Sequence, residues 1–171
     1  MDTAHIHLLL NHVPVIGLLI GFFVLAWGAL RKYHEVQTAG LSILFIASLV
    51  AIPVYLTGGP AGEIVERLPG VSEKVIELHE EAAIYSLVLC IVTGIVALLA
   101  LLARHFLSDS IGMIATFAVL ILTLPTGASI AFTANLGGQV RHTEIRQPQN
   151  GSTGGETRTT EKKKADDDDD N

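Results

Sequence analysis

The fold is decided by the stretch from Ala82 to Ala103, which reads AAIYSLVLCIVTGIVALLALLA and contains no charged residue. An α-helix rises about 1.5 Å per residue, so about 20 such residues cross the roughly 30 Å hydrocarbon core of a bilayer. Transmembrane strands would instead alternate apolar and polar residues over segments of about ten positions, and this stretch does not alternate. We therefore predict a membrane-spanning helix here.

Three further apolar runs have the same character, which gives four predicted spans at about residues 8–30, 39–57, 82–103 and 111–136. The connections 31–38 and 104–110 are short, so the helices that they join should be antiparallel neighbours. The longer, acidic connection 58–81 is expected to hold a surface segment at Glu63–Leu68, with Ser72 as N-cap of the next helix. The sequence predicts an all-α integral membrane four-helix bundle, up-down-up-down, over residues 1–146.

Composition supports a membrane protein and excludes nucleic-acid binding. Half of the 171 residues are hydrophobic and only 16% are charged, whereas soluble domains carry about 25% charged residues. The net charge of −6 owes much to the run Asp166–Asp170, and no basic field is present. Residues 147–171 are mostly Gly, Ser, Thr, Lys and Asp, without apolar periodicity, so we predict a disordered tail there. The expected partner of residues 1–146 is the lipid bilayer.

The orientation follows from the positive charges in the short connections. Arg31, Lys32 and Arg104 lie in these loops, and no Lys or Arg precedes the first span. Cytoplasmic loops are enriched in Lys and Arg. The two short loops should therefore face the cytoplasm, which places both termini on the other side, whereas Arg141 and Arg146 after the fourth span count against this orientation.

Small residues at helical spacing identify the faces that should point into the bundle. Small side chains let helix backbones approach closely in a membrane. Two spans carry such a stripe: Gly17, Gly21 and Gly28 in the first, and Ala83, Ser86, Cys90, Thr93 and Ala97 in the third.

Five of the seven histidines fall at one end of the predicted bundle once the chain is threaded through four antiparallel spans. They are His5, His7, His12, His79 and His142. His34 and His105 fall at the other end, where we expect loop or interface residues. On the first helix, His5 and His12 share one face, and His7, Asn11 and Pro14 form a neighbouring line. Polar groups at membrane depth usually face the bundle interior or a watery cavity, so the five histidines predict a shared functional site.

Imidazole groups in this pattern favour a metal or haem site. Neutral imidazole binds zinc, copper, iron and haem iron. A b-type haem needs two histidines from different helices at matched depth, and His12 with His79 or His142 would satisfy this, with Gly137 and Gly138 leaving room for a flat ring. The single cysteine, Cys90, excludes c-type haem and iron–sulfur centres.

We therefore predict haem b as the cofactor, with zinc, copper or iron as alternatives. The predicted cofactor ligands are His12, His79 and His142, and the wider set of metal ligands adds His5, His7 and Glu80. Side chains expected to orient the imidazoles by hydrogen bonding are Asn11, Glu80, Glu81 and Gln139.

Other functions use the same residues differently. A metal-dependent membrane hydrolase would use Glu80 or Glu81 as general base to a metal-bound water. A proton-relay or quinone-type site would also use His and Glu side chains. A non-catalytic subunit would use the polar end only to organise helix packing, as a homo-oligomer or inside a larger respiratory or redox membrane complex.

Three motifs resemble a known family. They are His5-Ile-His7-Leu-Leu-Leu-Asn11-His12-Val-Pro14, then Leu68-Pro-Gly-Val-Ser72 leading to His79-Glu80-Glu81, and Leu136-Gly-Gly-Gln-Val-Arg141-His142. They are similar to the bacterial four-helix membrane proteins catalogued as domain of unknown function 2231, over roughly residues 4–146. The resemblance implies a multi-pass protein of the bacterial inner membrane. Its layout is also like that of small b-type cytochromes, and the histidine cluster at a single end implies at most one haem.

Overall fold

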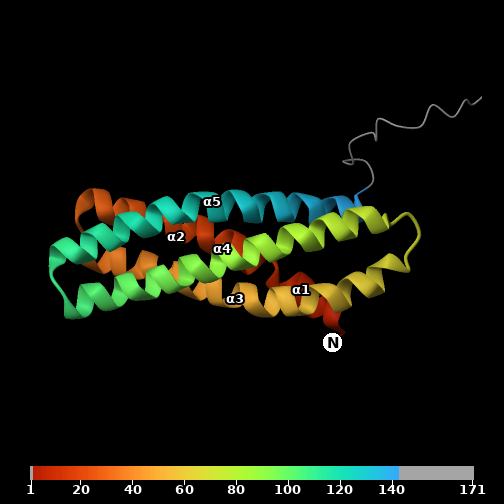
Figure 1. The fold of residues 1–171 in the computed structure, drawn as a ribbon, viewed down its shortest axis with the longest axis horizontal. Helices are drawn as coiled ribbons and strands as arrows, with labels where there is room; N and C mark the ends of the chain where they lie inside the picture. Colours follow the sequence, from red (N-terminus) through yellow and green to blue (C-terminus); the bar gives the residue numbers. More distant parts are fainter. Residues whose placement is uncertain (1, 143–171) are drawn as a thin grey trace, which may run out of the picture.

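The computed structural model describes residues 2–142, which form an elongated helical bundle (Figure 1). Its described helices are α1 (Thr3–Leu10), α2 (His12–Arg31), α3 (His34–Glu66), α4 (Glu73–Phe106) and α5 (Asp109–Arg141). Only Asn11 separates α1 from α2, so these two helices make one crossing. The predicted disordered tail, residues 147–171, lies outside the described residues.

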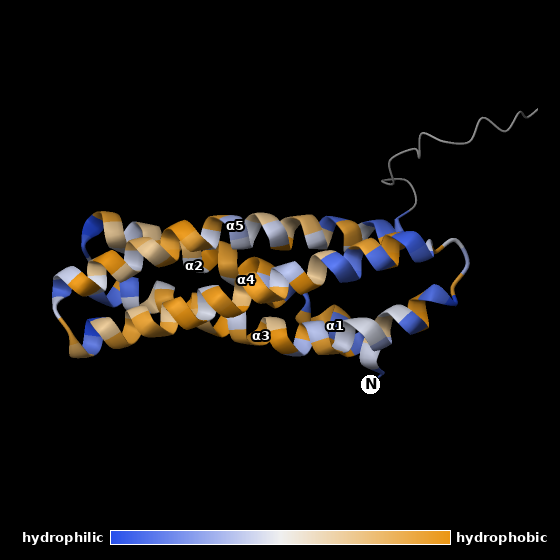
Figure 2. Cartoon of the chain, viewed as in Figure 1, coloured by the Kyte–Doolittle hydropathy of each residue, from blue (hydrophilic) through white to orange (hydrophobic). Residues whose placement is uncertain are grey.

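Four helical segments are long and apolar enough to cross a membrane: Thr3–Arg31, His34–Glu66, Glu73–Phe106 and Asp109–Arg141. Apolar residues cover the middle of the bundle, and hydrophilic residues gather towards its ends (Figure 2). The prediction of an all-α integral membrane four-helix bundle with up-down-up-down topology is confirmed.

Helix α3 continues further than its predicted span. The connection is predicted to begin at Gly58, but α3 runs through Gly58, Gly59 and Pro60 to Glu66, so the predicted surface segment Glu63–Leu68 lies partly within α3. α4 begins at Glu73. Proline inside a helix removes one hydrogen bond, and a carbonyl freed near the end of the bundle can be solvated, so the helix can continue. Ser72 does precede α4 as predicted, although its side chain makes no capping hydrogen bond.

Helices α2, α3, α4 and α5 form a closed ring in which each packs against the next and α2 packs against α5. The small-residue stripes face inward as predicted: Gly17 and Ala83 are half-buried, and the other members, Gly21, Gly28, Ser86, Cys90, Thr93 and Ala97, are buried. α2 and α3 approach each other closely at Gly40. A Cβ atom on Gly40 would stand 2.6 Å from the backbone nitrogen of Leu25, so only glycine permits this packing.

Buried hydroxyl groups join α4 to α5. The Ser86 hydroxyl lies 2.8 Å from those of Ser129 and Thr133, and the Thr93 hydroxyl lies 2.8 Å from that of Thr126. Thr126 donates its own proton to the carbonyl of Leu122, so Thr93 must donate to Thr126. Hydrogen bonds of this kind hold helices together in lipid.

The Thr93–Thr126 hydrogen bond gives a stability prediction. Thr93→Val keeps the shape of the side chain, removes one interhelical hydrogen bond and leaves Thr126 its bond to Leu122. Such bonds are worth about 0.6 kcal/mol on average and up to about 1.7 kcal/mol. We expect a loss of that size in the free energy of unfolding, measured by circular dichroism during detergent-induced unfolding. Ile121→Val on the exposed surface should change little, and equal stability of both variants would contradict the prediction.

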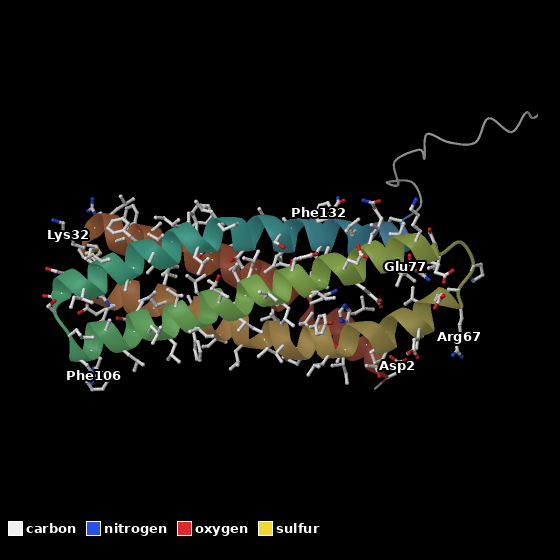
Figure 3. All side chains as sticks on the ribbon, in the orientation of Figure 1. Asp2, Lys32, Arg67, Glu77, Phe106 and Phe132 are labelled. Carbon is white, nitrogen blue, oxygen red and sulfur yellow. The ribbon has the colours of Figure 1, made fainter. Side chains whose placement is uncertain are left out.

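The outward surface of the bundle is apolar. Large side chains such as Phe23, Trp27, Ile121 and Phe132 are more than half exposed, and Phe132 points away from the bundle (Figure 3). Helices that are apolar on all sides are typical of proteins surrounded by lipid. The surface is therefore suited to contact with a bilayer.

Candidate histidine site at one end of the bundle

The structure sorts the histidines between the two ends as predicted. α1, the end of α3, the start of α4 and the end of α5 meet at one end, which Asp2, Arg67 and Glu77 mark in Figure 3. His5 and His7 lie in α1 and His79 lies in α4, while His12 begins α2 and His142 directly follows α5 at the same end. His34 and His105 lie at the opposite end, which Lys32 and Phe106 mark. We call the first the histidine end and the second the short-loop end.

A helix break places His7 against α3. Pro14 has no backbone N–H to donate to the carbonyl of Leu10, the residue at which α1 ends. α1 packs against α3. There the Nδ1 atom of His7 lies 3.0 Å from the carbonyl oxygen of Val54 and 3.3 Å from the hydroxyl of Thr57. The ring is half-buried, and its Cε1 atom would lie 3.4 Å from a Cβ atom on Gly58.

His79 has the same relation to α5. Its half-buried ring places Nδ1 2.9 Å from the carbonyl oxygen of Thr133. The ring lies beside Gly137, where an added Cβ atom would be 3.0 Å from Cε1 of His79. In both helices a glycine follows the accepting carbonyl by four residues: Gly58 follows Val54 in α3, and Gly137 follows Thr133 in α5.

These contacts fix which nitrogen of each ring carries the proton. A carbonyl oxygen can only accept, so Nδ1 of both His7 and His79 must donate. The neutral rings therefore keep the lone pair on Nε2. Histidines that ligate metals commonly donate their other N–H to a carbonyl in this way, which orients the ring.

His7 and His79 belong to helices that do not pack against each other. α1 and α4 make no direct helix–helix contact, and both belong to the described part of the chain. Both rings lie at the histidine end, each hydrogen-bonded to the backbone of a different facing helix.

An acidic cleft lies at the same end of the bundle. It lies between α3 and α4 and has a volume of about 330 Å³. Its lining includes Gly59, Gly62 and Ile76 together with Glu63, Glu66, Glu73, Glu77 and Glu80. Glu80 approaches α3 closely, since a Cβ atom on Gly62 would lie 3.1 Å from its Oε1 atom. Glu81, the other predicted carboxylate, is exposed and does not line this cleft.

The remaining predicted histidines lie at the surface. His5 interacts with Asp2. The Asp2 Oδ1 atom accepts a hydrogen bond from the His5 backbone N–H at 2.9 Å and lies 3.3 Å from the ring Nδ1 of His5. The backbone hydrogen bond holds the pKa of the Asp2 carboxyl below its ordinary value. His12 and His142 are both exposed, His12 at the start of α2 and His142 just after α5.

Backbone carbonyls of α3 and α5 bond to the Nδ1 atoms of His7 and His79, which is the role predicted for the side chains of Asn11, Glu80, Glu81 and Gln139. Gln139 donates to Asn135 at 2.7 Å. The Oδ1 atom of Asn11 is buried without a hydrogen-bond partner at the helix break.

Within residues 2–142 no three His, Cys, Asp or Glu side chains are grouped closely enough to hold a metal ion. The described geometry therefore offers two tethered imidazoles rather than a three-ligand site of the kind that catalytic zinc requires.

A network at the short-loop end was not foreseen. Arg104 donates to the side chain of the fully buried Gln37, and Gln37 donates to the carbonyl of Gly28 at 3.0 Å. The same guanidinium lies 2.8 Å from Nδ1 of His34, and its stem packs against Gly112 of α5. His34, expected to be a simple interface residue, thus belongs to a network that touches α2, α3, α4 and α5.

Comparisons of the chain with protein-family models, with curated proteins and with solved structures give no match. The resemblance to domain of unknown function 2231 stays a prediction that rests on its three sequence motifs.

Proposed function

We propose that this protein is a small membrane redox protein that binds one b-type haem at the histidine end, with His7 and His79 as the two iron ligands. One observation carries the proposal. Two imidazoles at the same end of the bundle, from separate helices, each donate Nδ1–H to a backbone carbonyl, at 3.0 Å and 2.9 Å, and so keep Nε2 available for a metal.

The donor set fits a haem better than the alternatives. Haem iron takes two axial protein ligands, which two imidazoles can supply, and a bound haem would provide one-electron transfer. Zinc sites need at least three protein ligands. A metal-dependent hydrolase would therefore have to recruit Glu80, which neighbours His79 in sequence and lies within its electrostatic range. That hydrolase and a non-catalytic accessory subunit are the competing functions.

The proposed setting is the bacterial inner membrane, with the histidine end and both termini on the non-cytoplasmic side. The support is the placement of Arg31, Lys32 and Arg104 at the short-loop end, because positive residues favour cytoplasmic loops. An electron-transfer protein of this size would act with a larger respiratory or redox membrane complex or as a homo-oligomer.

The test is a visible spectrum of the full chain purified in mild detergent, oxidised and then reduced with dithionite, with elemental analysis on the same sample. A Soret band with sharp α and β bands on reduction, and about one iron per chain, is the expected result. A colourless protein with stoichiometric zinc or copper would replace the haem proposal with the hydrolase. Protein without metal, even after incubation with haemin, would leave the accessory subunit.

A further inference from the structure

Each tethered imidazole lies over a glycine at a fixed position of the facing helix. His7 donates to the carbonyl of Val54 and lies over Gly58, and His79 donates to the carbonyl of Thr133 and lies over Gly137. We call Val54 with Gly58, and Thr133 with Gly137, the two carbonyl–glycine pairs. In both pairs the glycine comes four residues after the carbonyl.

This spacing has a physical reason. In an α-helix the N–H of the residue four positions later bonds to the carbonyl, so that residue stands beside the oxygen. A side chain there crowds any second donor that approaches the oxygen from outside the helix. A Cβ atom on Gly137 would lie 3.0 Å from Cε1 and 3.3 Å from Nδ1 of His79, which is too close without movement of the ring. A Cβ atom on Gly58 would lie 3.4 Å from Cε1 of His7, which is a milder contact.

We infer that Gly58 and Gly137 are positioning residues, which open a helix carbonyl to each histidine and thereby fix the proton on Nδ1. The two pairs lie in different helices and serve different histidines, yet they use the same arrangement. Nε2 of both rings is then presented as a lone-pair donor before any ligand binds. Both tautomers are properties of the protein with nothing bound. Only the use of the Nε2 lone pairs as iron ligands rests on the proposed function.

The experiment is ¹⁵N NMR of the metal-free full chain, with labelled histidine in detergent micelles at pH 8, where histidine rings are neutral. His7→Gln and His79→Gln assign the two signals by their loss. The variants are Gly137→Ala and Gly58→Ala, with Gly127→Ala as the matched control. Gly127 also lies in α5, and a Cβ atom there meets nothing within 4 Å.

In the wild-type protein both rings should carry the proton on Nδ1. Gly137→Ala should lower the Nδ1–H to Nε2–H ratio of His79 by roughly 2- to 10-fold, the equivalent of one hydrogen bond. Gly58→Ala should lower the ratio of His7 by less, because its contact is milder. Each glycine variant should change only the histidine that it faces. The signal of the other histidine should match the wild type, and in Gly127→Ala both signals should match it.

A wild-type proton on Nε2 of either ring, or ratios in both glycine variants equal to those of Gly127→Ala, would overturn the inference. If Gly137→Ala does not fold, the ratio of His7 in Gly58→Ala decides the question alone. Because the measurement uses protein without haem, the two proposals can fail separately. A wild-type protein that binds no haem but shows these tautomers refutes the proposed function and leaves the positioning role intact.

Discussion

Replacing His79 with alanine is expected to abolish the haem spectrum of the purified protein. The variant removes one of the two proposed iron ligands, and in the described structure no other histidine shares the tether to Thr133. His7→Ala should have the same effect for the same reason. The measurement is the Soret absorbance per mole of protein after incubation with haemin, with circular dichroism to establish that the helices are intact.

Matched variants make this prediction discriminating. His105→Ala removes an exposed histidine at the short-loop end and should leave the spectrum unchanged. His12→Ala tests the ligand set predicted from the sequence, which includes His12, against the set favoured by the structure, which includes His7 instead. His12 is exposed, whereas His7 is hydrogen-bonded to α3. Full haem binding in both His7→Ala and His79→Ala would exclude these two ligands, and loss in His12→Ala alone would favour the sequence-based choice.

The largest effect on stability is expected from Gly40→Ala. A Cβ atom at this position would stand 2.6 Å from the nitrogen, 2.7 Å from Cα and 2.8 Å from Cβ of Leu25. The first two of these atoms belong to the backbone of α2, so relief requires the two helices to separate. Overpacking of this kind costs about 1–3 kcal/mol, and we expect a loss of that size in detergent-induced unfolding followed by circular dichroism.

The control for Gly40→Ala is Gly127→Ala, which makes the same chemical change in open space. Alanine has a higher helix propensity than glycine, so this control should be neutral or slightly stabilising in the same assay. If Gly40→Ala unfolds at the same detergent concentration as Gly127→Ala, the close contact between α2 and α3 is not maintained in the protein.

The spans and the grouping of histidines at one end could be predicted because both depend on chain order and hydropathy alone. The stretch Ala82–Ala103 requires a crossing, and four antiparallel crossings sort the histidines between two ends. The extent of α3 could not be predicted in this way. Gly58, Gly59 and Pro60 are common helix-ending residues, and only tertiary packing shows that the helix continues to Glu66.

The choice among the histidines depended on helix rotation, which hydropathy does not fix. His12 lies deeper in the first apolar run than His7, which favours it by depth, but the structure exposes His12 and turns His7 towards α3. The inward face is apparent only in the structure, where Pro14, on the same helix face as His7, is buried. Nothing in the sequence marks the carbonyls of Val54 and Thr133 as acceptors, because every residue has a backbone carbonyl.

The contrast between the two ends has a consequence for the kinetics of the molecule. At the short-loop end the guanidinium of Arg104 bridges to Gln37 and His34, and the stem of the same side chain packs on α5. Gln37 is fully buried. At the other end α1 has no fully buried residue and packs mainly on α3. Segments with few buried contacts open first. Amide exchange should therefore be faster in α1 than in the other helices. Local opening of α1 would move His7 away from α3 while the short-loop end stays packed, and this gives a bulky ligand an entry route.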